Sequence, residues 1–235
     1  MKPLFAFLVM LSLAGCASTS PGDPKDPYEA YNRKVFAFND SLDKTVLKPV
    51  AQGYNSYLPA PVRTLLDNFF SNLEDVTITL NDLLQLKFKQ AASDGSRVLI
   101  NTTFGIFGLI NVTERLEKHN EDFGQTLGYW GVESGPYLML PFFGPSSARD
   151  GIGLAGDGLT GVVTNIPDVT TRNSLFITDK IGERAALIKH ESTLDDVSDR
   201  YAFIRDFYLA RRQNLVYDGD PPRAQFNDEE DEILE

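Results

Sequence analysis

Residues 61–84 (PVRTLLDNFFSNLEDVTITLNDLL) decide the fold class of this chain of 235 residues. Apolar side chains recur there at helical spacing and predict a helix that begins near Pro61, with one apolar face made by Val62, Leu65, Leu66, Phe69, Phe70, Leu73 and Val76. Leu80, Leu83 and Leu84 are expected to continue this face after a bend. Alternating strand patterns are scarce elsewhere, and no internal repeat is found. The sequence therefore predicts an all-α protein.

Helical spacing in the rest of the chain predicts a single domain over 26–217. The first helix is expected to start with Asp26 as N-cap, Pro27 at the first and Glu29 at the third helical position, and to be interrupted at Pro49. Further helices are expected over 88–103, 112–118, 148–164, 172–190 and 194–215. The segment 218–235 ends in a run with six acids and no base, so we expect it to be disordered.

The N-terminus has the pattern of a lipoprotein signal. Lys2 precedes an apolar run over 4–13, which is too short to cross a hydrocarbon core of about 30 Å. The tetrapeptide that follows, Leu13-Ala14-Gly15-Cys16, resembles a bacterial lipobox. We therefore expect residues 1–15 to be removed, Cys16 to be acylated and 16–25 to form a flexible tether.

The single cysteine and the net charge restrict what the chain can bind. Because Cys16 has no cysteine partner, the chain can form neither an intramolecular disulfide nor a zinc site built on cysteines. The net charge of −11 disfavours nucleic acid and gives no attraction to an anionic bilayer. Acyl chains on Cys16 would nevertheless anchor the protein. Ala17, by resemblance to lipoprotein sorting in enteric bacteria, points to the periplasmic face of the outer membrane.

Three uncharged stretches are unusual for a soluble helical domain: 98–113, 134–148 and 159–167. Each is too short to cross a bilayer as a straight helix but has the length of an interfacial or re-entrant segment. Burial in the protein core is the competing explanation. The adjacent rings of Tyr129 and Trp130 favour the headgroup level of a membrane, which is a weak indication by itself.

Motifs for cofactor or metal binding are weak. Residues 151–156 match the pattern GxGxxG, but no strand leads directly into them, so close helix packing through the small residues is the favoured interpretation. His119 and His190 have no other His or Cys within a helical turn, so we expect two surface histidines and no metal site. The sequence predicts no catalytic residue and no cofactor.

Four blocks of motif residues follow one another over 26–150. They are Asp26-Pro27-x-Glu29-x-x-Asn32-Arg33-x-x-Phe36-x-Phe38-Asn39, then Asn68-Phe69-x-x-Asn72-Leu73-Glu74, then Phe123-Gly124-x-Thr126-Leu127-Gly128-x-x-Gly131-Val132, and finally Gly135-Pro136-Tyr137-x-x-Leu140-Pro141-x-x-Gly144 followed by Arg149-Asp150. In these blocks, their order and the lipobox, the chain resembles the MlaA/VacJ lipoproteins of Gram-negative bacteria.

The resemblance implies a helical ring that lies in the inner leaflet of the outer membrane around an amphipathic central channel. Such a protein removes mislocalised phospholipid from the outer leaflet and passes it to a periplasmic phospholipid carrier of the Mla pathway, with trimeric porins as membrane partners. Helices satisfy their own backbone hydrogen bonds, so a helical ring can lie among acyl chains.

Two other functions stay open. One is an envelope scaffold that docks on porins without moving lipid; the uncharged stretch 98–113 opposes it, because a docking domain has no need to enter the leaflet. The other is a lipase. Ser146 and Ser147 lack the GxSxG elbow, however, and we expect one of them to cap the following helix, with Asp150 near its third position.

The resemblance and the side-chain chemistry together name two sets of candidate residues. The candidates for lipid contact or the channel are Phe36, Phe38, Asn39, Phe104, Phe107 and Arg149. Those expected to shape the backbone or the fold are Asp26, Pro27, Asn32, Gly135, Pro136, Pro141, Gly144 and Asp150.

The sequence leaves some of these roles open. The aromatic spacing of the first helix is typical of packing, and the amide of Asn39, among apolar neighbours, needs a partner. Arg149 has two possible roles, bidentate binding of a lipid phosphate and a structural ion pair with Asp150 or another acid. Around Gly105 and Gly108 we expect an apolar hairpin that enters the leaflet or gates the channel, formed by Phe104, Ile106, Phe107, Leu109 and Ile110.

Overall fold

The computed structural model describes residues 24–194 and 196–222, and these are mostly helical, as predicted. In chain order the helical elements are α2 (Glu29–Leu42), a π-helical turn (Asp43–Leu47), α3 (Lys48–Tyr57), α4 (Ala60–Leu84), α5 (Phe88–Phe104), α6 (Phe123–Tyr129), α7 (Ala148–Thr160), α8 (Val169–Leu187), a 3-10 helix (Ile188–Leu194) and α9 (Arg200–Val216). The predicted signal 1–15, Cys16, most of the tether and the acidic end 223–235 lie outside the described residues.

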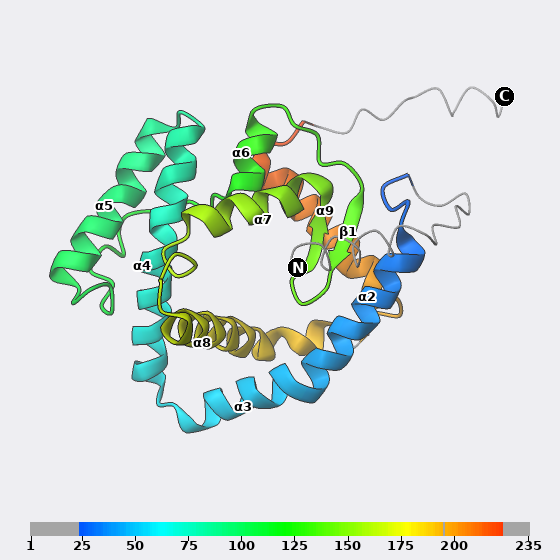
Figure 1. The fold of residues 1–235 in the computed structure, drawn as a ribbon, viewed down its shortest axis with the longest axis horizontal. Coiled ribbons are helices and arrows are strands. Elements are labelled where there is room, and N and C mark those ends of the chain that lie inside the picture. The colour runs from blue at the N-terminus through cyan, green and yellow to red at the C-terminus, as the bar shows by residue number, and fades with distance from the viewer. Residues whose placement is uncertain (1–23, 195, 223–235) are drawn as a thin grey trace, which may run out of the picture.

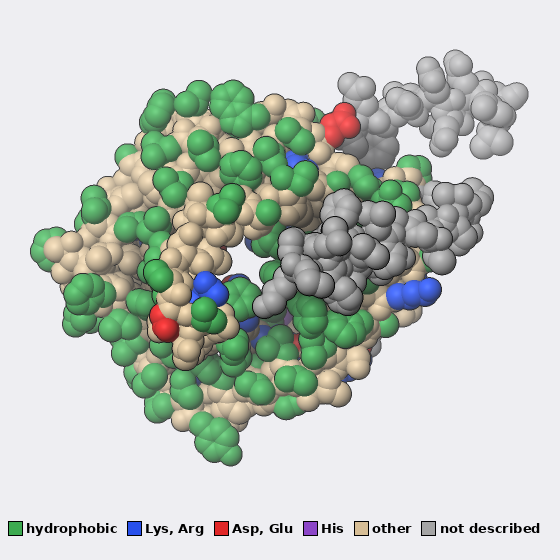
Figure 2. Space-filling view, in the orientation of Figure 1, with side chains coloured by type: hydrophobic (Ala, Val, Ile, Leu, Met, Phe, Trp, Pro, Cys, Tyr) green, Lys and Arg blue, Asp and Glu red, His purple; other side chains and the backbone are tan. Residues whose placement is uncertain are grey.

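The helices are arranged as a ring (Figure 1). α2 and α3 form one side, α4 forms the next, and α7, α6, α9 and a β-hairpin complete it, while α8 packs on both α3 and α4. The ring surrounds an opening, which is also visible as a hollow in the space-filling view (Figure 2). α5 packs along α4 on the outer side of the ring. The ring-like helical domain implied by the resemblance is therefore confirmed.

The strands form the one sheet within the described residues. β1 (Tyr137–Leu140) pairs antiparallel with β2 (Gly144–Ser147), with Tyr137 opposite Ser147 and Leu140 opposite Gly144. The side chains of Tyr137 and Met139 are fully buried. The uncharged stretch 134–148 thus contributes to the protein core, which was the alternative to membrane contact for this stretch.

The first helix differs from its prediction at both ends. Asp26 is not the side-chain cap: α2 begins at Glu29, and the cap position is held by Tyr28 without a side-chain bond. Pro49 does not end the helix, because the chain stays helical to Tyr57. The π-helical turn before Pro49 restarts the hydrogen-bond ladder, so that the proline falls in the first turn of α3, where no backbone N–H is required.

The other predicted helices are mostly confirmed. α4 runs without the expected bend, and α5, α7, α8 and α9 lie close to their predicted ranges. The helix predicted over 112–118 is wrong. This segment is an irregular return loop that polar bonds hold against α5: Asn101 Nδ2 donates to Thr113 Oγ1 (2.9 Å), and a guanidinium nitrogen of Arg97 donates to the Leu116 carbonyl (3.0 Å). α6 was not predicted.

Burial in α4 and α5 is inverted relative to a water-soluble helix. The buried side chains of α4 are Asn72, Asp75, Ile78, Asn81 and Asp82, and those of α5 are Ala91, Asp94, Arg97 and Asn101. The exposed ones include much of the apolar face that predicted α4, together with large residues of α5: Val62, Leu65, Leu80, Leu83, Leu84, Phe88, Leu99 and Phe104. Figure 2 shows hydrophobic side chains along the outline of the ring. Monomers in water rarely expose so much contiguous apolar surface.

A conventional core lies on the opposite side of the ring. Val35 of α2, Tyr137 and Met139 of β1, and Tyr201 of α9 form a buried cluster. Partly buried side chains pack around it, among them Phe36, whose ring meets that of Tyr201 edge-on at 5.7 Å. None of the helices within 24–194 and 196–222 combines the length and the apolar character needed to cross a membrane.

Candidate functional site

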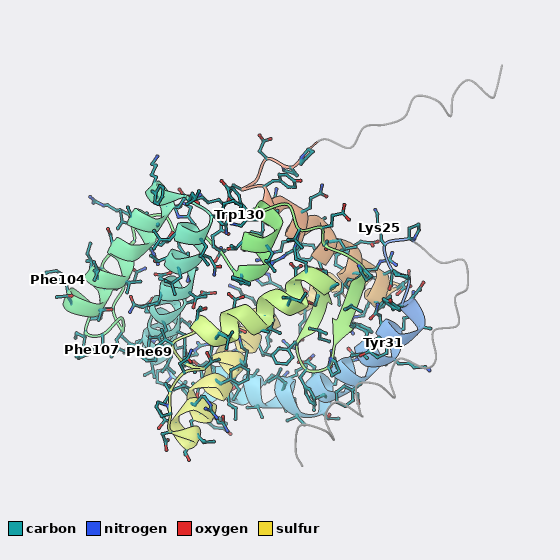
Figure 3. All side chains as sticks on the ribbon, turned by 45° about the horizontal axis from the view of Figure 1, so that its top comes forward. Lys25, Tyr31, Phe69, Phe104, Phe107 and Trp130 are labelled. Carbon is teal, nitrogen blue, oxygen red and sulfur yellow. The ribbon has the colours of Figure 1, made fainter. Side chains whose placement is uncertain are left out.

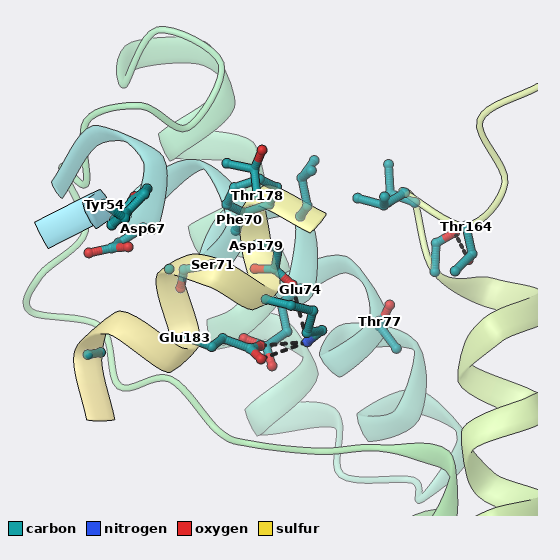
Figure 4. Close-up of a pocket in the computed structure, with 17 residues that line it drawn as sticks. Tyr54, Asp67, Phe70, Ser71, Glu74, Thr77, Thr164, Thr178, Asp179 and Glu183 are labelled. Atoms are coloured by element: carbon teal, nitrogen blue, oxygen red, sulfur yellow. Dashed lines mark hydrogen bonds and ion pairs between the residues drawn. The ribbon is translucent and has the colours of Figure 1, made fainter. Parts of the chain in front are cut away.

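A cavity of about 430 Å³ lies where α8 crosses α4, two helices that border the ring opening in Figure 1; Figure 4 shows the cavity in close-up. Its lining mixes apolar and polar side chains from α3, α4, the α7–α8 loop and α8, including Tyr54, Phe70, Leu73, Thr77, Val162 and Thr178. The volume falls within the range of small-molecule sites. The lining can therefore contact both the apolar and the polar part of an amphiphile.

Charged side chains lie at one end of this cavity. Lys180 Nζ contacts Glu183 at 2.7 Å and Asp179 at 3.3 Å (Figure 4). Burial lowers the pKa of Lys180, but the bonds to Glu183 outweigh that effect, so the pKa stays above its ordinary value and the side chain is a cation. On the α4 side, the carboxylate of Glu74 pairs with Lys118 Nζ at 2.6 Å.

A polar seam joins α4, α5 and the return loop. We use this name for Asn72, Asp75, Asn81 and Asp82 of α4, Asp94, Arg97 and Asn101 of α5, and Thr113, Lys118, His119 and Glu121 of the loop. Its centre is Asp75, which is fully buried, accepts a hydrogen bond from Arg97 Nε at 3.0 Å and forms an ion pair with Lys118 Nζ at 3.1 Å. Such buried pairs must be well bonded, because taking charges out of water costs several kcal/mol per ion.

One carboxyl of the seam has no partner. Asp82 is fully buried, and neither of its carboxyl oxygens forms a hydrogen bond within the described part of the chain. Burial, reinforced by the negative charges of Asp94 and Glu121, raises the pKa of Asp82 to about 7. His119 is not the surface histidine that we expected, because its Nδ1 lies 2.7 Å from the buried carboxyl of Asp94.

The predicted apolar hairpin is a protruding tip at the end of α5. We call residues 104–110 the apolar tip; Phe104 and Phe107 are each 74% exposed and lie at the far edge of the molecule (Figure 3). Two asparagines of α4 hold the tip from beneath. Asn68 Nδ2 donates to the Leu109 carbonyl at 3.1 Å. Asn72 packs so closely against Gly108 that a side-chain atom at Gly108 would collide with it. Burial of Phe104 and Phe107 in the core, the competing explanation for the stretch 98–113, is thereby excluded.

Two residues of the apolar tip carry backbone strain. Ile106 and Phe107 adopt φ values of 53° and 56°, in the left-handed region that bulky side chains rarely occupy. Glycine or asparagine would relax this turn in water. The sequence instead holds large apolar side chains outward at some cost in stability.

Two asparagines of α2, seven positions apart, bind the β-hairpin to the helix. Asn32 Nδ2 donates to the Tyr137 carbonyl at 3.1 Å, and its Oδ1 accepts from Met139 N at 2.8 Å. Asn39 repeats the arrangement at the hairpin turn, with Nδ2 donating to the Leu140 carbonyl and Oδ1 accepting from Phe142 N, both at 2.9 Å. The prediction that the Asn39 amide finds a partner is confirmed, and its partner is the backbone.

Of the other motif residues in and before α2, some pack in the conventional core and one is exposed. Asp26 accepts from Asn32 at 2.8 Å and also from the Tyr201 hydroxyl, so it belongs to the conventional core. Phe36 packs there as well. Phe38 is exposed and meets the ring of Phe142 edge-on at 5.4 Å, next to the hairpin turn.

The glycines and prolines of the fourth block shape the β-hairpin, as predicted. Gly135 and Gly144 have φ values of 67° and 83°, and they lie before β1 and at the start of β2. Pro136 precedes β1 directly, and Pro141 begins the turn after it. The turn also holds Phe142 in a left-handed conformation (φ 69°), where its ring is exposed.

Arg149 is bound within the protein. Its Nε donates to Asp150 Oδ1 at 2.9 Å, and both side chains are buried. Asp150 also accepts from the Tyr208 hydroxyl at 2.6 Å and lies 3.0 Å from Arg212 Nε. Burial raises the pKa of Asp150, but Arg212 and these hydrogen bonds outweigh it, so the pKa is below its ordinary value and the carboxyl is ionised. Of the two roles left open for Arg149, the structural ion pair is the one formed here.

The motifs that imitate enzymes have structural explanations. Gly153 packs against the backbone of Gly124, and Gly156 against the ring of Phe123, so the GxGxxG pattern brings α7 close to α6, as predicted. Ser147 caps α7 by accepting from Asp150 N at 3.1 Å. Ser146 is buried as well, which leaves neither hydroxyl open to a substrate.

The polar seam is the feature that sequence reasoning missed. Three of its four α4 members recur at helical spacing (72, 75, 82), away from the apolar residues, and so form a second face. The asparagine and aspartate side chains on this face were the available signal. It was overlooked because the apolar face of a helix is normally the buried one.

Comparison with known proteins places the chain in a family. The family model for the MlaA lipoprotein matches residues 24–215. The intermembrane phospholipid transport system lipoprotein MlaA of Escherichia coli (strain K12) is 34% identical over 218 residues, covering 88% of this chain and 86% of that protein. The protein of the same name from Haemophilus influenzae is 29% identical, covering 92% and 90%. An uncharacterized protein of Rickettsia typhi is 42% identical, covering 81% and 78%.

A solved structure agrees with these relatives. It comes from work on the structural basis for maintenance of bacterial outer membrane lipid asymmetry, and it matches with a TM-score of 0.73 and 32% identity, covering 81% of this chain and 98% of that one. The sequence motifs, the helical ring and these matches agree, and the chain belongs to the MlaA lipoprotein family.

Proposed function

We propose that this chain is an outer-membrane lipoprotein, anchored at Cys16 on the periplasmic face, that takes mislocalised phospholipid from the outer leaflet through its ring and passes it to a periplasmic carrier. The observation that carries the proposal is the contrast between the apolar exterior of the ring and the mixed lining of the cavity at its opening. E. coli MlaA, a relative by sequence, is named for intermembrane phospholipid transport.

The exterior supports placement among acyl chains. Exposed apolar residues on α4, on α5 and at the apolar tip have no partner within the described residues that removes them from solvent. Phe104, Ile106 and Phe107 would enter the leaflet, where the cost of exposing them to water disappears. The strain at Ile106 and Phe107 favours the same interpretation.

The interior supports passage of an amphiphile. Phe70, Leu73 and Val162 offer apolar contacts for acyl chains. Tyr54, Thr77 and Thr178 offer hydrogen-bonding groups for a headgroup, and the paired charges described above lie at one end of the cavity. The protein then lowers the barrier for lipid movement, and other components set the direction.

The test narrows the cavity without changing the exterior. Thr77→Trp places a large ring in the cavity, whereas Leu80→Trp places the same ring on the outer face of α4. In cells lacking the protein, outer-leaflet phospholipid labelling should rise. Leu80→Trp should restore the low level, and Thr77→Trp should not, although both proteins are acylated and folded.

The same cells separate the alternatives. If loss of the protein leaves outer-leaflet phospholipid labelling unchanged and alters only porin assembly, the chain is the porin-docking scaffold. If clearance needs the protein but Thr77→Trp clears phospholipid as well as Leu80→Trp does, the cavity is not the path of the lipid. Thin-layer analysis of phospholipid incubated with purified protein tests the lipase, because a transporter leaves the lipid intact. Cys16→Ala, exported in normal amount, should no longer fractionate with the outer membrane.

A further inference from the structure

The junction between α4 and α5 is a second apolar protrusion, remote from the apolar tip. We call Leu86, Phe88, Tyr129 and Trp130 the elbow; Leu86 is 57% exposed, Phe88 65% and Trp130 59%. Leu86 has a φ of 60°, so this turn, like the apolar tip, holds a bulky apolar residue outward in a left-handed conformation. α5 separates the two protrusions by about 25 Å, and Figure 3 shows Trp130 far from Phe104 and Phe107.

The elbow differs from the apolar tip in its chemistry. Trp130 donates its indole N–H to the Leu84 carbonyl at 3.1 Å, which fixes the ring at the end of α4 while its face stays exposed. The ring of Tyr129 meets that of Trp130 edge-on at 5.8 Å, and Lys87 Nζ lies 5.5 Å from the centre of the Tyr129 ring. Every residue of the apolar tip is uncharged, whereas the elbow combines amphipathic rings with neighbouring cations.

An exposed positive charge adjoins the elbow in the sequence. Lys89 is exposed next to Phe88, and no acidic side chain within the described ranges pairs with it. Lys87, in contrast, is neutralised by Glu121 at 2.8 Å and Asp218 at 2.6 Å. Exposed Lys89 thus adjoins Phe88, a residue of the elbow, and a cation together with exposed Trp and Tyr rings matches the phosphate level of a bilayer, where the rings have one apolar and one hydrated side.

We propose that the elbow binds lipid headgroups at the membrane surface while the apolar tip reaches the acyl chains, so that the α4–α5 hairpin is fixed at two different depths. The inference rests on the proposed membrane placement of the ring. It adds an orientation: α5 descends into the leaflet from its N-terminal end. Lys89 would pair with a phosphate, and Trp130 would lie at the boundary of the headgroups.

The natural sequence provides the probe, because Trp130 is the only tryptophan. The acylated protein is reconstituted into vesicles of phosphatidylethanolamine and phosphatidylglycerol that contain phosphatidylcholine brominated either near the headgroup or near the middle of the acyl chain. Emission of Trp130 should shift to the blue on membrane binding and be quenched more strongly by the shallow bromines. In a second protein, which combines Phe107→Trp with Trp130→Phe, the deep bromines should quench more strongly.

The outcomes separate the orientation from the proposed function. Quenching in the Phe107→Trp, Trp130→Phe protein without quenching of Trp130 in the natural sequence would overturn the elbow proposal alone and leave this surface to a protein partner. Stronger quenching of Trp130 by the deep bromines would overturn the two-depth arrangement. If neither position is quenched, the membrane placement fails as well, whereas the cellular lipid assay tests transport separately.

A charge variant gives an independent measurement. For the unacylated Cys16→Ala protein, Lys89→Gln should weaken binding to phosphatidylglycerol vesicles about fivefold at low salt, since one basic residue near an anionic surface is worth about that factor. Lys34→Gln, which removes an exposed lysine of α2, is the matched control and should have no such effect. Equal effects of the two variants would contradict a specific headgroup contact at the elbow.

Discussion

The α4–α5 hairpin and the β-hairpin region bury their helix faces in opposite ways. Around β1, an apolar cluster of Val35, Tyr137, Met139 and Tyr201 excludes water, and buried polar groups such as Asn32 dock the strand against it. Between α4 and α5, the polar seam is buried and the apolar residues face outward. One region is thus organised for folding in water, where the hydrophobic effect drives burial. In the other, hydrogen bonds and ion pairs between the elements take over that role, an arrangement that fits the proposed placement of the ring among acyl chains.

The largest effect should come from breaking the polar seam. Arg97→Met leaves the buried carboxylate of Asp75 with Lys118 as its remaining cation, so the free energy of unfolding should fall by about 3–5 kcal/mol. Denaturant unfolding in detergent measures it. The matched control is Lys44→Met, which removes an exposed ion pair with Asp40 and should cost at most about 1 kcal/mol. Equal effects would mean that the seam does not hold the hairpin together.

Asp82 tests the same seam through pH. Its folded pKa of about 7 is above the ordinary value of 3.8, so the protonated carboxyl favours the folded state, and this contribution is lost as the pH rises through 7. Asp82→Asn keeps the neutral form at all pH values. Its stability should match the wild type near pH 4 and exceed it by up to about 4 kcal/mol at pH 8. A pH-independent difference would show that Asp82 does not titrate in this range.

A charge introduced on the apolar exterior should weaken membrane insertion without lowering the stability of the fold. Phe107→Asp should weaken bilayer insertion by up to about 2.5–3.5 kcal/mol and impair phospholipid clearance. The melting temperature in detergent should not fall, because aspartate tolerates the left-handed conformation at this position. Phe107→Leu is the apolar control and should preserve clearance. A stable Phe107→Asp protein with wild-type clearance would remove the apolar tip from the mechanism.

The smallest effects on stability are expected for the two asparagines that hold the β-hairpin, and they should differ in size. Asn32→Ala leaves the Tyr137 carbonyl and the Met139 N–H without their side-chain partner in a buried position, and should cost about 2 kcal/mol of unfolding free energy. Asn39→Ala removes equivalent bonds at the more exposed turn and should cost about 1 kcal/mol. Thermal unfolding compares the two variants. The reverse order would indicate that the hairpin is held by its turn.

The sequence alone determined much of the molecule. Helical periodicity located α4 and α5 closely and α7 to α9 approximately. A serine cap at Ser146 or Ser147, which proved to be Ser147, and the glycines of the β-hairpin followed from local backbone chemistry. These features depend on residues that are near one another in the chain, so short-range rules suffice. The motif blocks added the ring and the family by resemblance.

Other features were decided by tertiary structure alone. The segment 112–118 has a helical pattern, but Asn101 and Arg97 of α5 bind its backbone and side chains as a return loop. Asn32 and Asn39 proved to hold a strand that lies about a hundred positions away in the chain. Apolar periodicity in α4 also could not say which face is buried. A period of 3.6 residues marks an apolar face equally well whether that face meets protein or lipid, and only the packing of α5 against the polar face distinguishes the two.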